Sequence, residues 1–472
     1  MIDSRKSTTF ANIRAELDVC DTRDVSHMVK ALDNGYYKPL NNAARKIWES
    51  KYGSLSEETP SDKNDTNVGV RPPKEHGLAY GLARGVPIVL GIEELPWPRV
   101  PSLQTLGTNL IKELDNNEPN LVPSTGDPDD DKVAAAALLA KLGDPDFKGP
   151  HSLFSMECAL LNDARVRPCS TSAWEGVLRE TNYACDIMPA GAVRELDLED
   201  VHQVSVLISG PRVWLLFPLS NHNLRVFMKY VSRKGKKNRI SHAMMFDLLQ
   251  DGLAFIQQPG ETLIIPPFCL TASVSSKLSI SVGNSVTLAT GFVHRLQNMD
   301  LFMTQNALQD EKVRFVELAA FYGELMGDLS TILENKVSKY DARPLVRSIT
   351  DIWSKAMPKI CKMFTTLYPK PETAKGMQAR ELGRLLAGAM AEAAPNHRDD
   401  VPCWICGVAI KWNRRPVDHM IHRLGKHIVE SHWEAAVSPA IMELKRKTAE
   451  DVGPDPNRRR SGRKRVKRTA IE

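Results

Sequence analysis

The chain has 472 residues, of which 42% are hydrophobic and 25% are charged. This length leaves room for two or three domains whose cores are large enough to fold without disulfide bonds. The sequence shows no charged-then-apolar signal segment, and no apolar run approaches the roughly 18 residues of a membrane span. The composition therefore argues against a membrane protein and favours a reducing intracellular compartment, where a close cysteine pair indicates a metal site.

The net charge of +5 is concentrated in a C-terminal tail. Residues 457–472 carry eight basic residues and one acidic residue, a net +7, so the other 456 residues sum to −2. A block of like charges this dense is predicted to be disordered, and we expect a basic tail over residues 452–472. Such a tail favours nuclear import or contact with nucleic-acid phosphates; the alternative is a solvated terminus without a function.

Residues 1–84 are predicted to form a helical segment followed by a polar linker. The linker is residues 53–75, which are rich in Ser, Asp, Asn and Pro. The apolar positions of the helical part are Val29, Leu32, Ala43, Ile47 and Trp48.

Residues 85–296 are predicted to form a domain rich in β-strands. The runs Val204–Phe217 and Leu263–Ile265 are apolar, contain many β-branched residues and are bounded by turn residues, as buried strands are. An insertion near residues 116–150 is either mobile or functional, because long insertions in compact domains have one of these two origins. A basic loop, Arg233–Arg239, is either a contact for phosphate or an acidic partner, or a solvated insertion.

Two stretches of this domain resemble a known family. The first is Glu195-Leu196-Asp197, followed by a strand that contains Gly210, Arg212 and Trp214. The second is the turn Pro259-Gly260-Glu261, followed by Ile265-Pro266. Together they resemble the JmjC family of Fe(II)- and 2-oxoglutarate-dependent dioxygenases, in which a His-x-Asp pair, a Gly-x-Lys-x-Trp segment and a Pro-Gly-Glu turn precede an Ile-Pro motif and a third ligand, a His. The resemblance implies an α+β fold built on a double-stranded β-helix, the cupin or jelly-roll barrel, with flanking helices.

The resemblance also places a metal site, and its residues differ from those of the family. Glu195 takes the position of the first His, Asp197 keeps the carboxylate, and Thr271 takes the position of the second His. Arg212 stands where the family has the Lys that pairs with 2-oxoglutarate, which keeps the charge but changes the donor geometry. Iron(II) prefers imidazole nitrogen, whereas this set offers oxygen alone. We therefore expect a barrel that binds neither Fe(II) nor 2-oxoglutarate, unless His202, the nearest imidazole, serves instead.

Residues 297–395 are predicted to form a helical domain that packs on the barrel, because apolar residues recur there at three- and four-residue steps. The first stripe, expected to be core, consists of Leu308, Val313, Val316, Leu318, Phe321, Leu325, Leu329 and Ile332. Two further stripes follow, at Leu345, Ile349, Ile352, Met357, Ile360 and Met363, and at Leu382, Leu385, Leu386 and Met390.

Residues 401–434 are predicted to form a zinc finger. Cys403 and Cys406 give a C-x2-C pair, and His427 and His432 give an H-x4-H pair after a gap of 20 residues. Thiolate and imidazole ligands at such spacing suit tetrahedral zinc, and the segment resembles a C2H2 or BED-type finger. Two other imidazoles are alternative ligands: His419 and His422.

The role of the finger has two interpretations: it is a purely structural unit, or it binds nucleic acid. Zinc alone can stabilise a unit too small to own a core. In the second interpretation a helix carrying His422, Arg423 and Lys426 faces the major groove, with non-specific phosphate binding as the simpler form of contact.

Three hypotheses of function follow. The favoured one is a nuclear, chromatin-associated regulator or scaffold with a non-catalytic barrel, whose partners are chromatin proteins or histone and nucleic acid. The second is an active oxygenase that demethylates or hydroxylates lysyl residues of histone or another protein. The third is a zinc-finger DNA-binding transcription regulator in which the barrel only binds a partner.

Overall fold

The computed structural model describes residues 9–20, 23–40, 42–52, 87–91, 97, 99–122, 126–142, 153–163, 165–168, 174–218, 220–231, 242–306, 311–337, 342, 345, 348–349, 352, 401–403, 408–411, 416–428 and 430–431. The chain divides into two compact units, residues 1–352 and 353–472. The expected linker 53–75, the basic loop 233–239, the basic tail and most of the apolar stripes beyond residue 337 lie outside the described residues.

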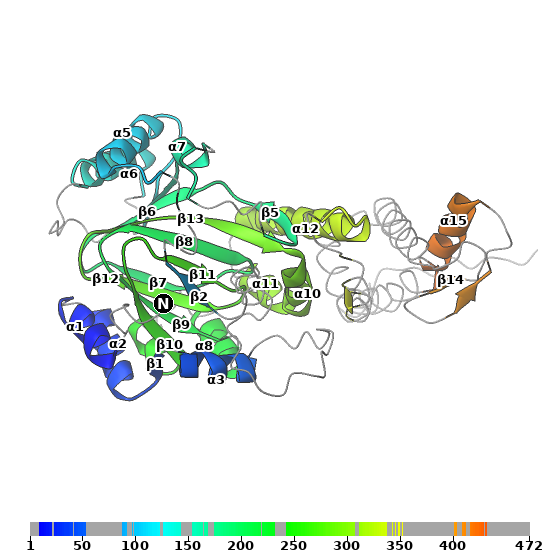
Figure 1. Ribbon diagram of the computed structural model, residues 1–472, viewed down its shortest axis with the longest axis horizontal. Helices are drawn as coiled ribbons and strands as arrows, with labels where there is room; N and C mark the ends of the chain where they lie inside the picture. Colours follow the sequence, from blue (N-terminus) through cyan, green and yellow to red (C-terminus); the bar gives the residue numbers. More distant parts are fainter. Residues whose placement is uncertain are drawn as a thin grey trace, which may run out of the picture. The chain divides into compact units, whose positions relative to one another are not determined.

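The first unit has an α+β fold with two large sheets, an arrangement compatible with a β-sandwich (Figure 1). The five-stranded sheet has the order β1-β10-β9-β12-β7; β1 and β10 are parallel, and the other neighbours are antiparallel. Its strands are β1 (Tyr37–Pro39), β7 (Val193–Leu198), β9 (Arg212–Phe217), β10 (Gly252–Gln257) and β12 (Leu270–Ser275).

The second sheet is antiparallel, with the order β2-β11-β8-β13-β6-β4-β3 and with β5 also paired to β13. Gly210 forms the turn from β8 to β9 with φ +68°, and a Cβ there would lie 2.2 Å from the Leu278 carbonyl oxygen, so this turn requires glycine. The strands are β2 (Ile88–Leu90), β3 (Asn120–Val122), β4 (Leu153–Glu157), β5 (Val177–Glu180), β6 (Ala184–Met188), β8 (His202–Ser209), β11 (Thr262–Ile265) and β13 (Ser279–Leu288).

Side chains from both sheets meet between them. Trp214 and Leu216 of β9 pack against Leu263 and Ile265 of β11. The alternate residues of β9 point to the opposite side of the sheet, into a cluster covered by helices. Because the strand is buried on both faces, it needs a continuous apolar run, and residues 213–217 supply one.

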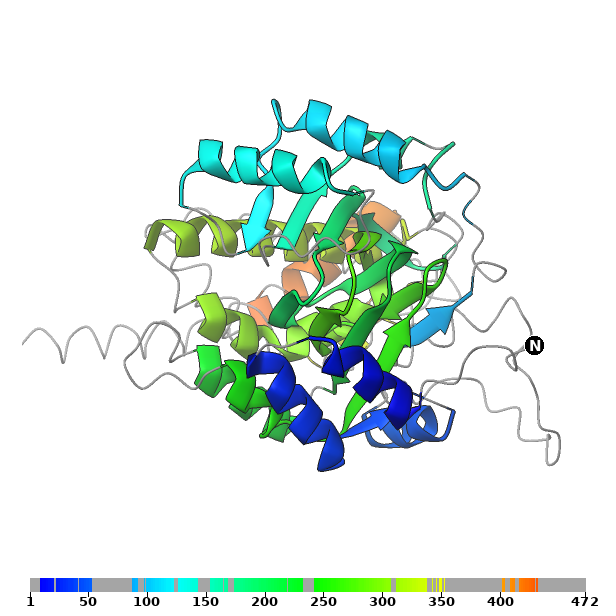
Figure 2. The ribbon, with the colours of Figure 1, turned by 90° about the vertical axis from the view of Figure 1, so that its left-hand side faces the viewer.

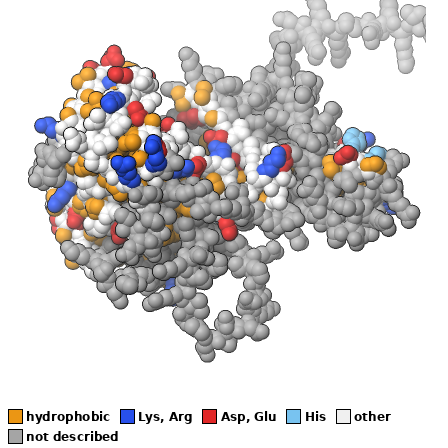
Figure 3. Space-filling model, turned by 45° about the horizontal axis from the view of Figure 1, so that its top comes forward, with side chains coloured by type: hydrophobic (Ala, Val, Ile, Leu, Met, Phe, Trp, Pro, Cys, Tyr) orange, Lys and Arg blue, Asp and Glu red, His pale blue; other side chains and the backbone are white. Residues whose placement is uncertain are grey.

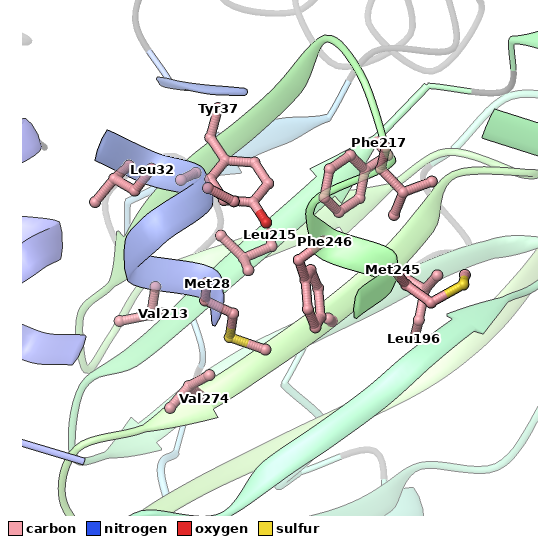
Figure 4. Close-up of a cluster of buried hydrophobic side chains, with 14 of the residues drawn as sticks. Met28, Leu32, Tyr37, Leu196, Val213, Leu215, Phe217, Met245, Phe246 and Val274 are labelled. Atoms are coloured by element: carbon pink, nitrogen blue, oxygen red, sulfur yellow. The ribbon is translucent and has the colours of Figure 1, made fainter. Parts of the chain in front are cut away.

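Four helices cover the outer face of the five-stranded sheet. Met28 and Leu32 approach Val213, Leu215 and Phe217 there (Figure 4). The covering helices are α1 (Phe10–Asp18), α2 (Arg23–Asp33), α8 (Asn221–Val231) and α9 (His242–Phe246).

In a third N-terminal helix, one of two neighbouring apolar residues is buried and the other is exposed. In α3 (Asn42–Tyr52), Trp48 is buried against the sandwich, whereas Ile47 is 47% exposed. Adjacent residues of a helix point in different directions, and the sandwich covers only the side that carries Trp48.

Helices α5 (Leu103–Glu113) and α6 (Pro128–Leu139) cover the outer face of the second sheet. Figure 2 shows the sheets between this pair and the α1–α2 pair. Helix α6 and strand β3 fall within the insertion expected near residues 116–150. The described part of that segment is therefore ordered core structure that buries the second sheet.

Three further helices follow β13: α10 (Ala289–Gln297), α11 (Met299–Asn306) and α12 (Glu311–Leu333), with a short α7 (Ala159–Asn162) earlier in the chain. Helix α12 buries the expected stripe from Leu318 to Ile332. Val313 and Val316, expected in the same core, are 45% and 67% exposed. These two valines thus do not face the core, and periodicity alone did not reveal this.

The second unit contains a hairpin of β14 (Val401–Pro402) and β15 (Ala409–Ile410), followed by α15 (Val417–Ile428). Met420 and Leu424 are buried on one face of α15. In the described part of the chain, no helix is long and apolar enough to span a membrane.

Candidate functional site

Two of the three expected metal-ligand positions lie opposite each other. Thr271 of β12 and Asp197 of β7 are paired in register on neighbouring antiparallel strands. Residues paired in this way have Cα atoms about 4.5–5.5 Å apart. The strands thus bring together two residues that are 74 positions apart in the sequence.

A β-bulge turns the third position, Glu195, in another direction. The register shifts between Thr271 and Ser273, so Glu195 and Leu196 both oppose a single residue of β12. Leu196 enters the cluster beneath α8, and Tyr230 of α8 donates a hydrogen bond from Oη to Glu195 Oε2 at 3.3 Å. Within the described residues no three His, Cys, Asp or Glu side chains form a group that could hold a metal ion.

His202 does not replace the missing imidazole. It opens β8 on the face that also carries Val204, which packs with Ile264 and Val286 on the outer side of the second sheet. A Cβ added at Gly291 of α10 would lie 4.0 Å from the His202 ring carbon Cε1. The ring therefore lies under α10, on the far side of the sheet from Asp197.

Arg212 places a fully buried cation between the sheets. Its Nη1 donates to Ser281 Oγ at 2.8 Å, its Nε and Nη2 donate to Ser279 Oγ at 3.2 Å, and its guanidinium lies 5.8 Å from the Trp214 ring centroid. Within the described chain, no carboxylate makes an ion pair with this guanidinium. Burial lowers the pKa of Arg212 to about 10, although nearby Asp186 acts in the opposite direction. A buried guanidinium held by hydroxyls presents donors that suit a carboxylate ligand.

Asp186 and Arg194 form an ion pair across the sheets, with 2.7 Å between Oδ2 and Nη2. The neighbours of Asp186, Cys185 and Ile187, enter the outer cluster, so the carboxylate points inward. Burial raises the pKa of Asp186, but the guanidiniums of Arg194 and Arg212 outweigh it and hold the pKa below its usual value. The two side chains of the pair are 21% and 28% exposed, so solvent reaches this part of the interior.

Acidic residues line the loop between β7 and β8. Burial, followed by the charges of Asp197 and Asp200, raises the pKa of Glu199 to about 7. The Glu199 carbonyl accepts a 2.7 Å hydrogen bond from the N–H of Phe268, whose φ is +58°. This bond connects the loop after Asp197 to the loop before Thr271.

A buried ion network joins this loop to α12. Arg295 of α10 donates to Asp200 at 2.7 Å and to Asp328 of α12 at 2.9 Å. Asp328 also accepts from Arg179 of β5, at 2.7 and 3.0 Å. The sequence did not predict this network or the Asp186–Arg194 pair, because isolated charged residues in a sequence do not reveal burial. The available signal for the network was the acidic run Asp197–Asp200.

The finger segment has a hairpin and a helix in the expected order. Cys403 is buried and donates its N–H to the Val408 carbonyl at 2.9 Å. Histidine side chains gather on α15 (Figure 3). His427 lies on the same face of the helix as the buried residues Met420 and Leu424. His419 is partly buried, and His422 is exposed. Two expected ligands, Cys406 and His432, lie outside the described residues.

Models of known protein families give no match to this chain, and curated protein sequences give none either. No family membership is therefore shown.

Proposed function

We propose that the protein is a nuclear, chromatin-associated regulator or scaffold whose JmjC-like barrel has lost its Fe(II) site and acts by binding. The geometry of the ligand positions carries the proposal: Asp197 opposes Thr271, while the Glu195 carboxylate contacts Tyr230. An oxygen-only set with one member turned toward α8 does not fit an ion that prefers two imidazoles and a carboxylate.

The strand order supports a double-stranded β-helix. The eight strands from β6 to β13 contribute four to each sheet, in the orders β11-β8-β13-β6 and β10-β9-β12-β7. If these strands are numbered one to eight along the chain, the orders are 6-3-8-1 and 5-4-7-2. Two four-stranded antiparallel sheets from eight such strands are the arrangement of a jelly roll.

An active member of the JmjC family would bind Fe(II) and 2-oxoglutarate. The interior of this protein suits these two groups unequally. Asp197 and Thr271 offer oxygen alone, which does not suit Fe(II). By the JmjC resemblance, Arg212 takes the position of the 2-oxoglutarate-binding Lys, and its buried guanidinium, held by Ser281, can pair with a carboxylate. The favoured function is therefore a binding module with a carboxylate-compatible interior, and an active lysyl demethylase or hydroxylase is the alternative.

Metal analysis tests this function. We expect the purified full-length protein to contain no stoichiometric iron and to release no succinate from 2-oxoglutarate in a substrate-dependent way. The Glu195→His, Thr271→His double variant should bind iron more tightly, because an imidazole at position 271 lies opposite Asp197 and the change at position 195 removes the carboxylate that Tyr230 holds toward α8. Each single variant is the matched control and should gain less. Substrate-dependent succinate release by the unmodified protein would establish the enzyme alternative.

The C-terminal unit is proposed to bind zinc through Cys403, Cys406, His427 and His432. Ser431 Oγ lies 3.2 Å from Nδ1 of His427, and the second nitrogen of a ligand histidine is ordinarily held by such a contact. The proposed partners are a chromatin protein or histone for the barrel, and nucleic acid for the finger and the basic tail.

A further inference from the structure

We propose that the finger contacts the phosphates of double-stranded nucleic acid without reading base sequence. This inference rests on the proposed zinc finger and names the kind of contact that it makes. It depends on which side chains of α15 are available to a partner.

Base-reading residues of a finger helix occupy positions −1, 3 and 6, which are three residues apart. Lys426 directly precedes the expected ligand His427 and is taken as position 6. Positions 3 and −1 are then Arg423 and Met420. Met420 is 1% exposed and packs inside the finger. Arg423 donates from Nη1 to the Lys411 carbonyl at 2.8 Å and so attaches α15 to the hairpin. Of the three positions, Lys426 alone has an exposed side chain that is not engaged in the finger.

Counting from the first residue of the helix gives the same outcome. Val417 begins α15, so this register selects Pro416, His419 and His422. Specific readout relies on bidentate Arg or Lys on guanine and on Asn or Gln on adenine. The first register has two residues of this kind, but Arg423 is bonded to the hairpin and leaves Lys426 alone, and the second register has none, so the helix lacks a constellation that discriminates bases.

The charge of the finger nevertheless suits a phosphate backbone. From Val401 to His432 the sequence has five basic and two acidic residues, a net +3. Lys411 is exposed, and Lys426 is 64% exposed with only a 3.7 Å contact to Glu430, a surface pair of small energy. Such lysines hold phosphates as point charges and carry no sequence information.

The test is a binding experiment with zinc-loaded full-length protein. A randomised 20-base-pair duplex library should yield no enriched motif, and unrelated duplexes should bind with equal affinity. Lys411→Ala and Lys426→Ala should weaken binding equally on every duplex, and each should lower the salt slope by about 1. Raising the salt from 50 to 200 mM weakens the binding of the unmodified protein by some factor. For a variant that has lost one phosphate contact, this factor should be about threefold to fourfold smaller.

Glu430→Gln is the matched control, because it removes the acidic neighbour of Lys426 and should strengthen binding to all duplexes alike. Arg423→Ala should speed the loss of zinc to a chelator, since it releases α15 from the hairpin. An enriched motif that disappears in Arg423→Ala or Lys426→Ala would overturn the inference. So would the absence of binding by the zinc-loaded protein, an outcome that leaves the proposed role of the barrel untouched.

Discussion

At the residue scale, the loop between β7 and β8 carries a carboxyl group, that of Glu199, whose pKa is raised by burial. Glu199 lies between Asp197 and Asp200, with the Arg194 guanidinium as the nearest opposing charge. A carboxyl group in this position is disfavoured as an anion both by desolvation and by its acidic neighbours. The folded protein should therefore hold a proton here at a pH where the unfolded chain has released it.

Glu199→Gln is expected to stabilise the protein at pH 8 and to have little effect near pH 4.5. The folded-state pKa is about 7 against an ordinary value of 4.5, so the folded state binds more protons in this interval and the free energy of unfolding falls as the pH rises through it. The amide has no charge to bury, and its advantage at pH 8 should be on the order of 1–3 kcal/mol.

Urea unfolding at pH 4.5 and pH 8 measures this difference. Glu118→Gln, at an exposed position, is the control and should leave stability unchanged at both pH values. A benefit of Glu199→Gln that is equal at the two pH values would show that the carboxyl group of Glu199 does not titrate between them.

At the scale of elements, the sequence predicted the strands whose apolar runs are buried on both faces. It did not predict the places where the backbone of a strand is irregular. The runs at Val204–Phe217 and Leu263–Ile265 became β8, β9 and β11. The bulge at Glu195 was not predictable, because it depends on pairing with β12. The polar interior around Arg212 was missed for a similar reason: Ser279 and Ser281 gain their role only when β13 faces β9.

Helix α15 leads to a prediction about zinc. Cys403→Ser should remove one zinc ion and unfold the finger, because so small a unit depends on the metal for its folding free energy. His427→Ala should do the same, since this residue shares the buried face of Leu424. His422→Ala is the matched control, because its side chain is exposed, and it should retain zinc.

Zinc content by mass spectrometry under native conditions and hydrogen exchange in α15 measure the effect. Exchange in the sandwich should not change in any of these variants. Loss of zinc in His422→Ala but not in His427→Ala would assign the ligand set differently.

At the scale of the whole molecule, the two units are expected to separate in function. Deleting residues 401–472 removes the finger and a tail of net +7, and should abolish zinc binding and reduce DNA binding and nuclear accumulation. The sandwich should unfold at an unchanged temperature. Retained association with chromatin in this deletion would favour the barrel as the anchor, whereas complete loss of it would favour the DNA-binding regulator.

The Arg295 network has a practical consequence for dissecting the protein. A fragment that ended at residue 296, one residue before the end of α10, would keep Arg295 and Arg179 but discard Asp328, their shared acceptor. It would also remove Phe321, whose ring lies 5.1 Å from the Arg295 guanidinium, and expose apolar surface that α12 now covers. Removing one partner from a buried ion pair costs about 3–5 kcal/mol, a large share of the stability of a domain. A fragment for expressing the sandwich by itself should therefore extend through α12 to at least Leu333.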